Sequence, residues 1–405
     1  MSFPNHSDHS AVAASSQDRV FNALDSFKIE LPSWGFANTG TRFGKFVQAA
    51  AATTIDEKFA DAAQVNNLTG CAPTVGLHVL WDLPGGLKEA ANIRSLEQKF
   101  GVKSGSINPN LFQDQDYKYG SIANPSEEIR AFALKHLLDS VEIAKALGSK
   151  DLSIWVADGS NYPGTQNMRK RIGYMESVLS TMHAALGPDQ RMLIEYKPFE
   201  PAFYHTDIAD WGMALELARR SGPKACVLVD TGHHYQGTNI EQIVAWLLHL
   251  GALGGFHFND RKYADDDLTL GSIDPYQVFR IFHEILSTPE AACKDVAFMI
   301  DQSHNLKGKI EAMIQTVVSA QELYARAALI DQDKLAELQQ SCNLVEAEEN
   351  FRSAFWTDVR PMLREWRESR GLRANPLTAL RESGYVEKIS GERASAAANA
   401  ISSYA

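Results

Sequence analysis

The stretch ACVLVDTGHHYQGTNIEQIVAWLLHLGALGGFHFND, residues 225–260, contains the pattern that decides the fold. Two short apolar runs lie at its ends, and between them apolar residues recur at steps of three and four, as on one face of an amphipathic helix. The two runs lack strict alternation of apolar and polar residues, which is typical of strands buried on both faces. Parallel strands need a crossover connection, so this stretch predicts a strand–helix–strand unit of a parallel sheet.

The same pattern continues in both directions along the chain, and the stretch above supplies two of eight short runs rich in apolar and β-branched residues. The other six are KIELPSWG (28–35), TVGLHVLWD (74–82), SINPNLF (106–112), DLSIWVADG (151–159), RMLIEYK (191–197) and VAFMIDQ (296–302). Helical patterns separate most of the eight runs.

From Lys28 to Gln302 the chain has 275 residues, close to the roughly 250 that are typical of a closed (β/α)₈ barrel. An open doubly wound sheet is the alternative, but it usually has fewer strands, and no GxGxxG follows the first run. We therefore predict an α/β fold, a (β/α)₈ TIM barrel with an additional C-terminal helical region.

The barrel is predicted to occupy residues 17–308. Residues 1–16 and 390–405 are small and polar, so we expect both tails to be disordered. Residues 309–389 are predicted to form a helical extension, which begins with a clear apolar stripe at 309–330. Packing outside the barrel, packing against another subunit and capping of its own barrel all suit this stripe.

The composition excludes several classes of protein. The chain of 405 residues is 44% hydrophobic and 22% charged, as expected for a soluble protein with a sizeable core. Its net charge of −11 would repel a nucleic-acid backbone. There is no apolar run of about 18 residues and no basic start followed by an apolar run, so we predict a cytoplasmic protein without a membrane span or secretory signal.

The four cysteines lie far apart and form no CxxC motif. This spacing excludes a cysteine zinc site and a dithiol redox motif, and it indicates scattered buried thiols in a reducing compartment.

Carboxylate and imidazole side chains gather at the carboxyl ends of the last four predicted strands. Because the catalytic groups of a barrel lie at this end, we expect these side chains to converge: Glu195, Asp230, His233, His257, the loop residues Asp265, Asp266 and Asp267, and Asp301. A single aspartate at a strand end is usually a helix cap. So many anions together would raise one another's pKa values and destabilise the fold unless a cation neutralised them. Oxygen and imidazole ligands without a thiolate suit Mn²⁺, Mg²⁺ or Co²⁺.

The spacing of two of these groups adds detail. Glu195 and Lys197 are two residues apart on a strand, so both point to the same side. Lysine in such a position is more often an ordinary surface residue, but beside a cation its pKa would fall and it could donate a proton or a hydrogen bond to a substrate oxygen. If the loop after His257 is extended, Asp265 and Asp267 face the metal and Asp266 is solvated.

The earlier strands carry aromatic and hydrogen-bonding groups instead. These groups suit a sugar, which has apolar CH faces and hydroxyl edges. Each aromatic residue alone is more often part of a core, so the functional interpretation depends on their positions at strand ends: Trp34, Phe43, His78, Trp81 and Trp155.

Several of these motifs together resemble the L-rhamnose isomerases of the broad-specificity bacterial type, enzymes that also interconvert D-allose and D-psicose. The resemblance covers most of the chain from about Leu31, in matching order and spacing, and it is carried by SWGFANTGTRF, LHVLWD, DYKYGS, IWVADGSNYPG, EYKPFEPAFYHTDIADWG, VDTGHH, GGFHFNDRKYADDDL and MIDQSHN. It implies a (β/α)₈ barrel, usually a homotetramer, with two divalent ions. Mn²⁺ is the expected ion, with Co²⁺, Mg²⁺ or Zn²⁺ as alternatives.

The resemblance also implies roles for individual residues. One ion, called structural in the family, would be held by Glu195, Asp230, His257 and Asp301, and a second, catalytic ion by His233, Asp265 and Asp267. Lys197 would assist at the substrate oxygen, and Ser303 would lie near the reacting end of the sugar. His78, Trp81 and Trp155 would line the sugar site, which Phe43 of a neighbouring subunit would close. One departure is Tyr196, where the family leads us to expect histidine; its side chain should point away from the pocket.

The implied activity is an aldose–ketose isomerisation, the interconversion of L-rhamnose and L-rhamnulose, with a monosaccharide as the partner and no organic cofactor. Three alternatives remain at this point: a metal-dependent sugar epimerase on the same barrel, a metal-dependent phosphoester hydrolase, and a non-catalytic carbohydrate-binding barrel. A hydrolase acting on nucleic acid would need a basic surface, which the net charge of −11 opposes.

Overall fold

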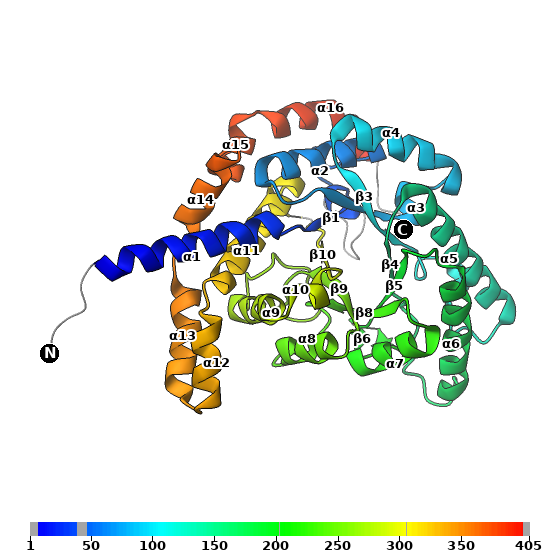
Figure 1. Ribbon diagram of the computed structural model, residues 1–405. Coiled ribbons are helices and arrows are strands. Elements are labelled where there is room, and N and C mark those ends of the chain that lie inside the picture. The colour runs from blue at the N-terminus through cyan, green and yellow to red at the C-terminus, as the bar shows by residue number, and fades with distance from the viewer. Residues whose placement is uncertain (1–6, 39–46, 202, 305, 400–405) are drawn as a thin grey trace.

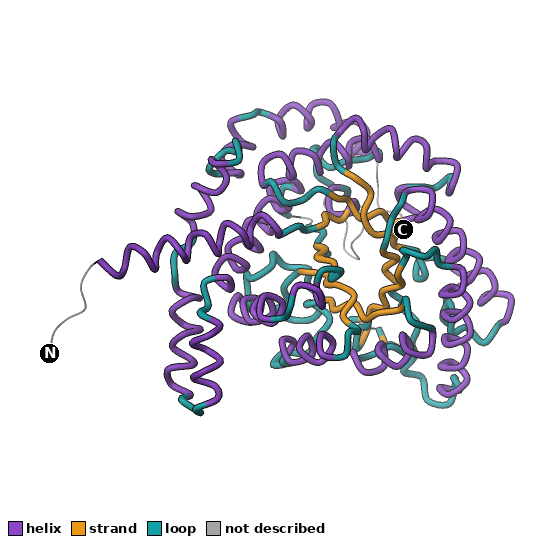
Figure 2. The backbone as a smooth tube through the Cα atoms, viewed as in Figure 1, coloured by secondary structure: helices purple, strands orange, loops and turns teal. Residues whose placement is uncertain are grey.

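In the computed structural model, which describes residues 7–38, 47–201, 203–304 and 306–399, eight parallel strands close into a barrel. The orange ring in Figure 2 is this barrel, and helices surround it. The strands follow one another around the barrel in chain order: β1 (Glu30–Pro32), β2 (Thr74–His78), β3 (Lys103–Asn108), β4 (Asp151–Ile154), β5 (Arg191–Glu195), β8 (Ala225–Asp230), β9 (Leu253–Phe258) and β10 (Ala297–Ile300). All eight lie within or overlap the runs identified from sequence, so the predicted TIM barrel is confirmed.

Helices connect the strands and cover the outside of the barrel (Figure 1). The first turns of several are capped by side chains that the sequence places there, such as Thr54 with Glu57 in a capping box before α2 and Asn239 before α8. The connecting helices are α2 (Ile55–Thr69), α3 (Val79–Asp82), α4 (Ala90–Phe100), α5 (Glu127–Leu147), α6 (Met168–Ala185), α7 (Trp211–Ser221), α8 (Ile240–His249), α9 (Pro275–Ser287) and α10 (Glu290–Cys293).

Two features of the connections were not predicted. A short antiparallel hairpin, β6 (Phe199–Glu200) with β7 (Tyr204–His205), follows β5. Helix α11 (Lys309–Ala328) packs against α9 and α2 and thus completes the ring of helices. The barrel therefore extends beyond residue 308, where the sequence analysis placed its end, because the apolar stripe of α11 covers its own barrel.

The remaining helices pack on the outside of the barrel. Helix α1 (Ser7–Ser26) lies against α11 and α14, and a small second core between them contains Val20, Leu24 and Trp366. The others are α12 (Gln332–Gln340), α13 (Leu344–Trp356), α14 (Arg360–Ser369), α15 (Pro376–Glu382) and α16 (Tyr385–Asn399). The described parts of the two predicted disordered tails, 7–16 and 390–399, are therefore helical, and the rest of both tails lies outside the described residues.

The last helix is fixed by a buried ion pair. Arg393 of α16 donates to both oxygens of Asp61 on α2, at 2.7 and 3.0 Å, and also to the carbonyl of Ala50, at 2.8 Å. Both charged side chains are buried. Breaking such a pair leaves a charge without compensation in a poorly solvated place, so this contact ties the C-terminal helix firmly to the barrel.

Two predictions from composition can also be compared with the structure. Among the described residues, no helix combines the length and apolarity that a bilayer crossing requires. All four cysteines are unpaired, as expected, but Cys71 alone is buried and Cys342 is exposed.

Candidate active site

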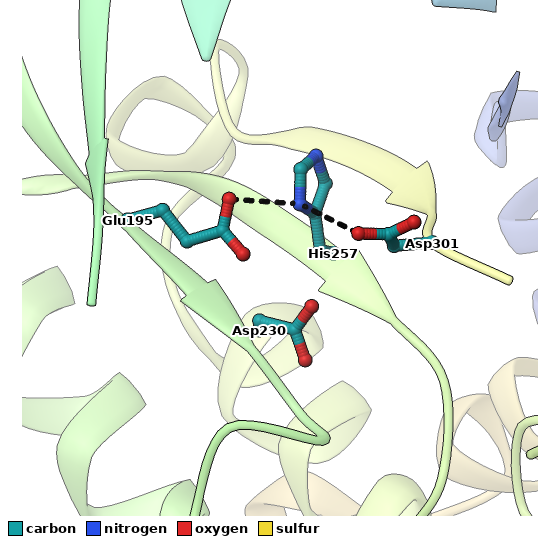
Figure 3. A group of neighbouring side chains, drawn as sticks. All are labelled: Glu195, Asp230, His257 and Asp301. Carbon is teal, nitrogen blue, oxygen red and sulfur yellow. Dashed lines mark ion pairs between the residues drawn. The ribbon is translucent and has the colours of Figure 1, made fainter. Parts of the chain in front are cut away.

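Four side chains converge at the carboxyl end of the barrel. Glu195, Asp230 and His257 come from β5, β8 and β9, and Asp301 follows β10 directly. Each offers one oxygen or nitrogen atom within 4.8 Å of those of the other three. Figure 3 shows the carboxylates of Glu195 and Asp301 on either side of the His257 ring, each joined to it by an ion pair, with Asp230 beside them. The first three side chains are buried and Asp301 is half-buried. This group is called the first cluster below.

The alternation of side chains along each strand explains the convergence. Leu193, Leu228 and Met299 form a small apolar cluster of their own, separate from the main core. Each of them lies two residues before a member of the first cluster and therefore points to the same side of the sheet. The residues between them, such as Ile194, Val229 and Ile300, belong to the main core under the helices. On this side of the barrel, the interior thus has an apolar floor from β5, β8 and β10 with an acidic layer above it.

The first cluster has strongly perturbed charges. Burial raises the pKa of Asp230, the charges of Glu195 and Asp301 raise it further, and its value is about 7. Burial by itself would raise the pKa of Glu195 too, but His257 and His233 lower it to about 2. The pKa of His257 rises to about 9 against the effect of burial, because Glu195 and other carboxylates surround it.

The contacts of His257 fit a cation. Its Nδ1 lies 3.2 Å from an oxygen of Glu195 and 3.6 Å from an oxygen of Asp301, yet it makes no hydrogen bond within the described residues. A buried ring nitrogen facing two carboxylates without a hydrogen bond is the arrangement expected of ligands around one ion. Ligand–ion distances of about 2.1–2.2 Å put neighbouring ligand atoms roughly 3 Å apart.

A second group of ligand atoms lies beside the first cluster. His233 Nδ1 is 3.2 Å from Glu195, and its Nε2 is 3.0 Å from Asp265. Although burial alone would lower the pKa of His233, the charges of Asp230 and Asp265 raise it well above its usual value. Asp267 joins this group electrostatically, because burial and the charge of Asp265 hold its pKa well above the ordinary range. His233, Asp265 and Asp267 are called the second cluster.

The loop that carries Asp265 and Asp267 is not extended. Both residues have left-handed backbone conformations, with φ of 54° and 50°, which are uncommon for residues other than glycine and cost energy. Between them, Asp266 accepts hydrogen bonds from the backbone N–H groups of Lys262, Tyr263 and Ala264 at 2.6–3.1 Å. Asp266 is partly exposed and closes the loop through these hydrogen bonds, which the sequence analysis did not predict.

Lys197 lies where the second cluster meets the hairpin β6–β7. Its Nζ is 2.6 Å from Asp265 and 2.8 Å from Glu200, and it also lies 5.0 Å from the centre of the Trp155 ring. The lysine is buried, so it is not an ordinary surface residue. Its place between the acidic groups and an aromatic ring suits contact with a polar ligand atom.

An aromatic wall faces the clusters from the other half of the barrel. His78 stacks on Trp81 with ring centres 3.6 Å apart, and Phe112 packs against Trp155 at 4.7 Å. Burial and the charge of Lys58 hold the pKa of His78 well below its usual value, so the ring is neutral. Such a surface combines apolar faces with a neutral hydrogen-bonding group.

Trp34 connects the aromatic wall to the first cluster. Its indole N–H donates a hydrogen bond of 2.8 Å to Asp301, while its ring lies edge-on to those of His78 and Trp81. This bond fixes the orientation of a carboxylate that is otherwise half-buried. The sequence singled out Trp34 as aromatic lining but gave no sign of this contact.

The other predicted site residues have different outcomes. Ser303 is buried two residues after Asp301, beside the first cluster in sequence. Tyr196 points into the main core, as predicted, and its hydroxyl lies 2.6 Å from Nε2 of His234. Phe43 lies outside the described residues, so its role stays a prediction. Phe112 was inside a predicted strand run but was not singled out as lining.

Comparisons with known proteins agree with this geometry. Residues 70–289 match the model of the family described as xylose isomerase-like TIM barrel. A protein named probable sugar isomerase from Rhizobium meliloti is 39% identical over 93% of this chain and 88% of its own length. A second protein of that name, from Mesorhizobium japonicum, is 38% identical over the same shares. Among solved structures, a xylose isomerase domain protein from Alicyclobacillus acidocaldarius superimposes with a TM-score of 0.53 at 15% identity, over 75% of this chain and 99% of its own. The last likeness shows the fold alone.

Proposed function

The chain belongs to the xylose isomerase-like TIM barrel family, and from this premise we propose that it is a metal-dependent aldose–ketose isomerase acting on a monosaccharide. One observation carries the proposal: two adjoining clusters of carboxylate and imidazole groups lie beside Lys197 and face an aromatic wall across the barrel mouth. The names of the Rhizobium and Mesorhizobium relatives support a sugar as the substrate.

The clusters would hold two divalent cations. Glu195, Asp230, His257 and Asp301 would hold the first, and His233, Asp265 and Asp267 the second. The oxygen and imidazole donors and the lack of a thiolate suit Mn²⁺, Mg²⁺ or Co²⁺, and the motif resemblance described above favours Mn²⁺, with Zn²⁺ as a further alternative. When bound, the cations supply Lewis-acid polarisation of sugar oxygens.

The protein's own side chains then position the sugar and hold its protons. His78, Trp81 and Trp155 would bind its CH faces and hydroxyl edges, with Phe112 behind them. Lys197 would donate a hydrogen bond to the oxygen of the reacting carbonyl, where negative charge develops. Ser303 would contact the reacting end, and Glu195 and Asp301 would border it.

The reaction is an internal oxidation and reduction that needs no outside electron acceptor. The hydrogen on C2 of the aldose moves to C1, so the C2 hydroxyl becomes a carbonyl and the C1 aldehyde becomes an alcohol. Transfer as a hydride keeps a C2 deuterium label in the product. Transfer through an enediol, with a protein base carrying the proton, allows the label to exchange with water. Analysis of the deuterium in the ketose product distinguishes the two routes.

We propose L-rhamnose and L-rhamnulose as the principal pair, with D-allose and D-psicose as a second, because of the motif resemblance described above. The test is product analysis of the purified, Mn²⁺-loaded protein with L-rhamnose, D-allose and L-mannose. Formation of the matching ketoses, abolished by a chelator and restored by Mn²⁺, is the expected result. Conversion of one ketose into another, with no activity on any aldose, would instead identify an epimerase.

A homotetramer is part of the same proposal. Three large aromatic side chains are largely exposed on loops after β4, β5 and β9: Tyr162 at 78%, Phe203 at 68% and Tyr263 at 82%. Exposed aromatic residues around one end of a barrel support a covered face. Sedimentation equilibrium of the purified protein tests this, and a monomer at micromolar concentration would contradict it.

A further inference from the structure

One amide side chain reaches two members of the first cluster from the strand between them. Asn259 is the first residue after β9, and its side chain is buried. Its Nδ2 lies 3.1 and 3.3 Å from the two carboxylate oxygens of Asp230 and 3.2 Å from the backbone carbonyl of Asp301. Because β9 lies between β8 and β10 in the barrel, both neighbouring strands are tied to the same amide.

The hydrogen bonds of the Asn259 side chain fix the orientation of its amide. Its Oδ1 is buried and has no hydrogen-bond partner among the described residues, whereas the amide nitrogen makes the contacts to Asp230 and Asp301. An amide turned the other way would place Oδ1 against a carboxylate and a carbonyl, which is repulsive. Both N–H groups of the amide therefore donate to residues of the first cluster.

The backbone around Asn259 is fixed as well. Its N–H donates to Thr231 Oγ1 at 3.0 Å, and the Thr231 hydroxyl donates back to the carbonyl of Asn259 at 2.7 Å. Gly232, which follows Thr231, leaves room for the Asn259 amide, because a Cβ at position 232 would lie 2.3 Å from Asn259 Oδ1. Gly232 also donates its N–H to Asp230 at 2.6 Å. The Asp-Thr-Gly sequence after β8 is thus fitted around the asparagine.

We propose that Asn259 is a positioning residue for the first cation, one that holds Asp230 and Asp301 in the geometry needed to bind it. The inference rests on the proposed function, because it requires that the first cluster bind a cation. The groups that orient a metal ligand contribute to affinity through the ligand, and their loss weakens binding about 10–100-fold.

The test compares Mn²⁺ binding to chelator-treated wild type, Asn259→Leu and Asn259→Ser by isothermal titration calorimetry. Leucine has a similar size without a donor, and serine is too short to reach both partners. The expected result is a Kd for the first Mn²⁺ about 10–100-fold higher in both variants. The Mn²⁺ concentration for half-maximal activity should rise in parallel, with little change in the KM for sugar.

Asn124→Leu is the matched control. Asn124 is also a buried asparagine, and its amide donates to the carbonyl of Gly120 at 2.6 Å in the loop before α5. This control should lower the melting temperature but leave the Mn²⁺ Kd within twofold of wild type. If Asn259→Leu does not fold, Asn259→Ser decides. Unchanged Mn²⁺ affinity in a folded Asn259 variant overturns the inference while leaving the proposed function intact, and a wild type that binds no Mn²⁺ overturns both.

Discussion

The affinity of the first cluster for Mn²⁺ should depend steeply on pH. Without a cation, the pKa of His257 is about 9 and that of Asp230 about 7. A ligand atom must be deprotonated to bind a metal, so the cation has to displace the protons that these two groups hold. The pKa of Glu195, about 2, means that this carboxylate is already ionised at every pH of interest. Raising the pH therefore favours binding.

The size of the effect follows from counting protons. Between pH 7 and pH 9 His257 accounts for about one proton of the free site, so this group alone should make Kd fall about tenfold for each pH unit, or roughly 1.4 kcal/mol. Below pH 7 Asp230 is protonated as well, and the change becomes about a hundredfold for each unit. From pH 6 to pH 8 the first Mn²⁺ should thus bind about a thousandfold more tightly.

Calorimetric titration with one equivalent of Mn²⁺ measures this at pH 6, 7, 8 and 9. Repeating it in two buffers with different ionisation enthalpies counts the protons released. The variant His257→Gln is the control: it should bind more weakly than wild type, but its Kd should be nearly constant between pH 7 and 9. A wild-type Kd that changes less than twofold over that range, or binding without proton release, would refute the charge assignment.

Three substitutions test other parts of the structure. Asp301→Asn removes one of three repelling carboxylates, so the metal-free protein should fold, but addition of Mn²⁺ should raise the melting temperature less than in wild type, because only the second cluster still binds a cation. In wild type, Mn²⁺ at 100 times Kd should add about 2.7 kcal/mol; an equal rise in the variant would contradict the ligand role. Lys197→Met should keep both cations, counted by metal analysis, and lose about 10²–10⁴-fold in kcat, whereas an unchanged kcat would make the lysine structural. Arg393→Ala should cost about 3–5 kcal/mol in urea unfolding, because Asp61 is left buried without its partner; the double variant with Asp61→Asn should recover part of this loss, and a single variant as stable as wild type would show that the pair contributes nothing.

The eight strands and the first cluster could be predicted from sequence because both depend on short-range rules. Parallel strands buried on both faces read as continuous apolar runs, and strand ends in a barrel share one face. Glu195, Asp230, His257 and Asp301 each stand at such an end. Their convergence therefore needed only the strand boundaries and the alternation of side chains.

The features that sequence missed depend on loop conformation and on tertiary packing. The strands of hairpin β6–β7 are only two residues long, and prolines at 198 and 201 flank the first, which hides a strand pattern. The left-handed conformations of Asp265 and Asp267 have no signal in three consecutive aspartates. Helix α11 carries the same apolar stripe whether it covers its own barrel or another subunit, so only the three-dimensional arrangement identifies it as the helix that completes the ring.

The two halves of the barrel carry different kinds of side chain at the site. The ionisable groups of both clusters come from the half formed by β5, β8, β9 and β10 and its loops, whereas the aromatic wall comes from the half formed by β1 to β4. Under the proposed function, substitutions within the first 160 positions would change which sugar is bound while the residues of both clusters stay the same. Trp34 is the exception, because it belongs to the aromatic half but its indole N–H donates a hydrogen bond to Asp301 in the other half. Substitutions of Trp34 should therefore change both the choice of sugar and the reaction rate.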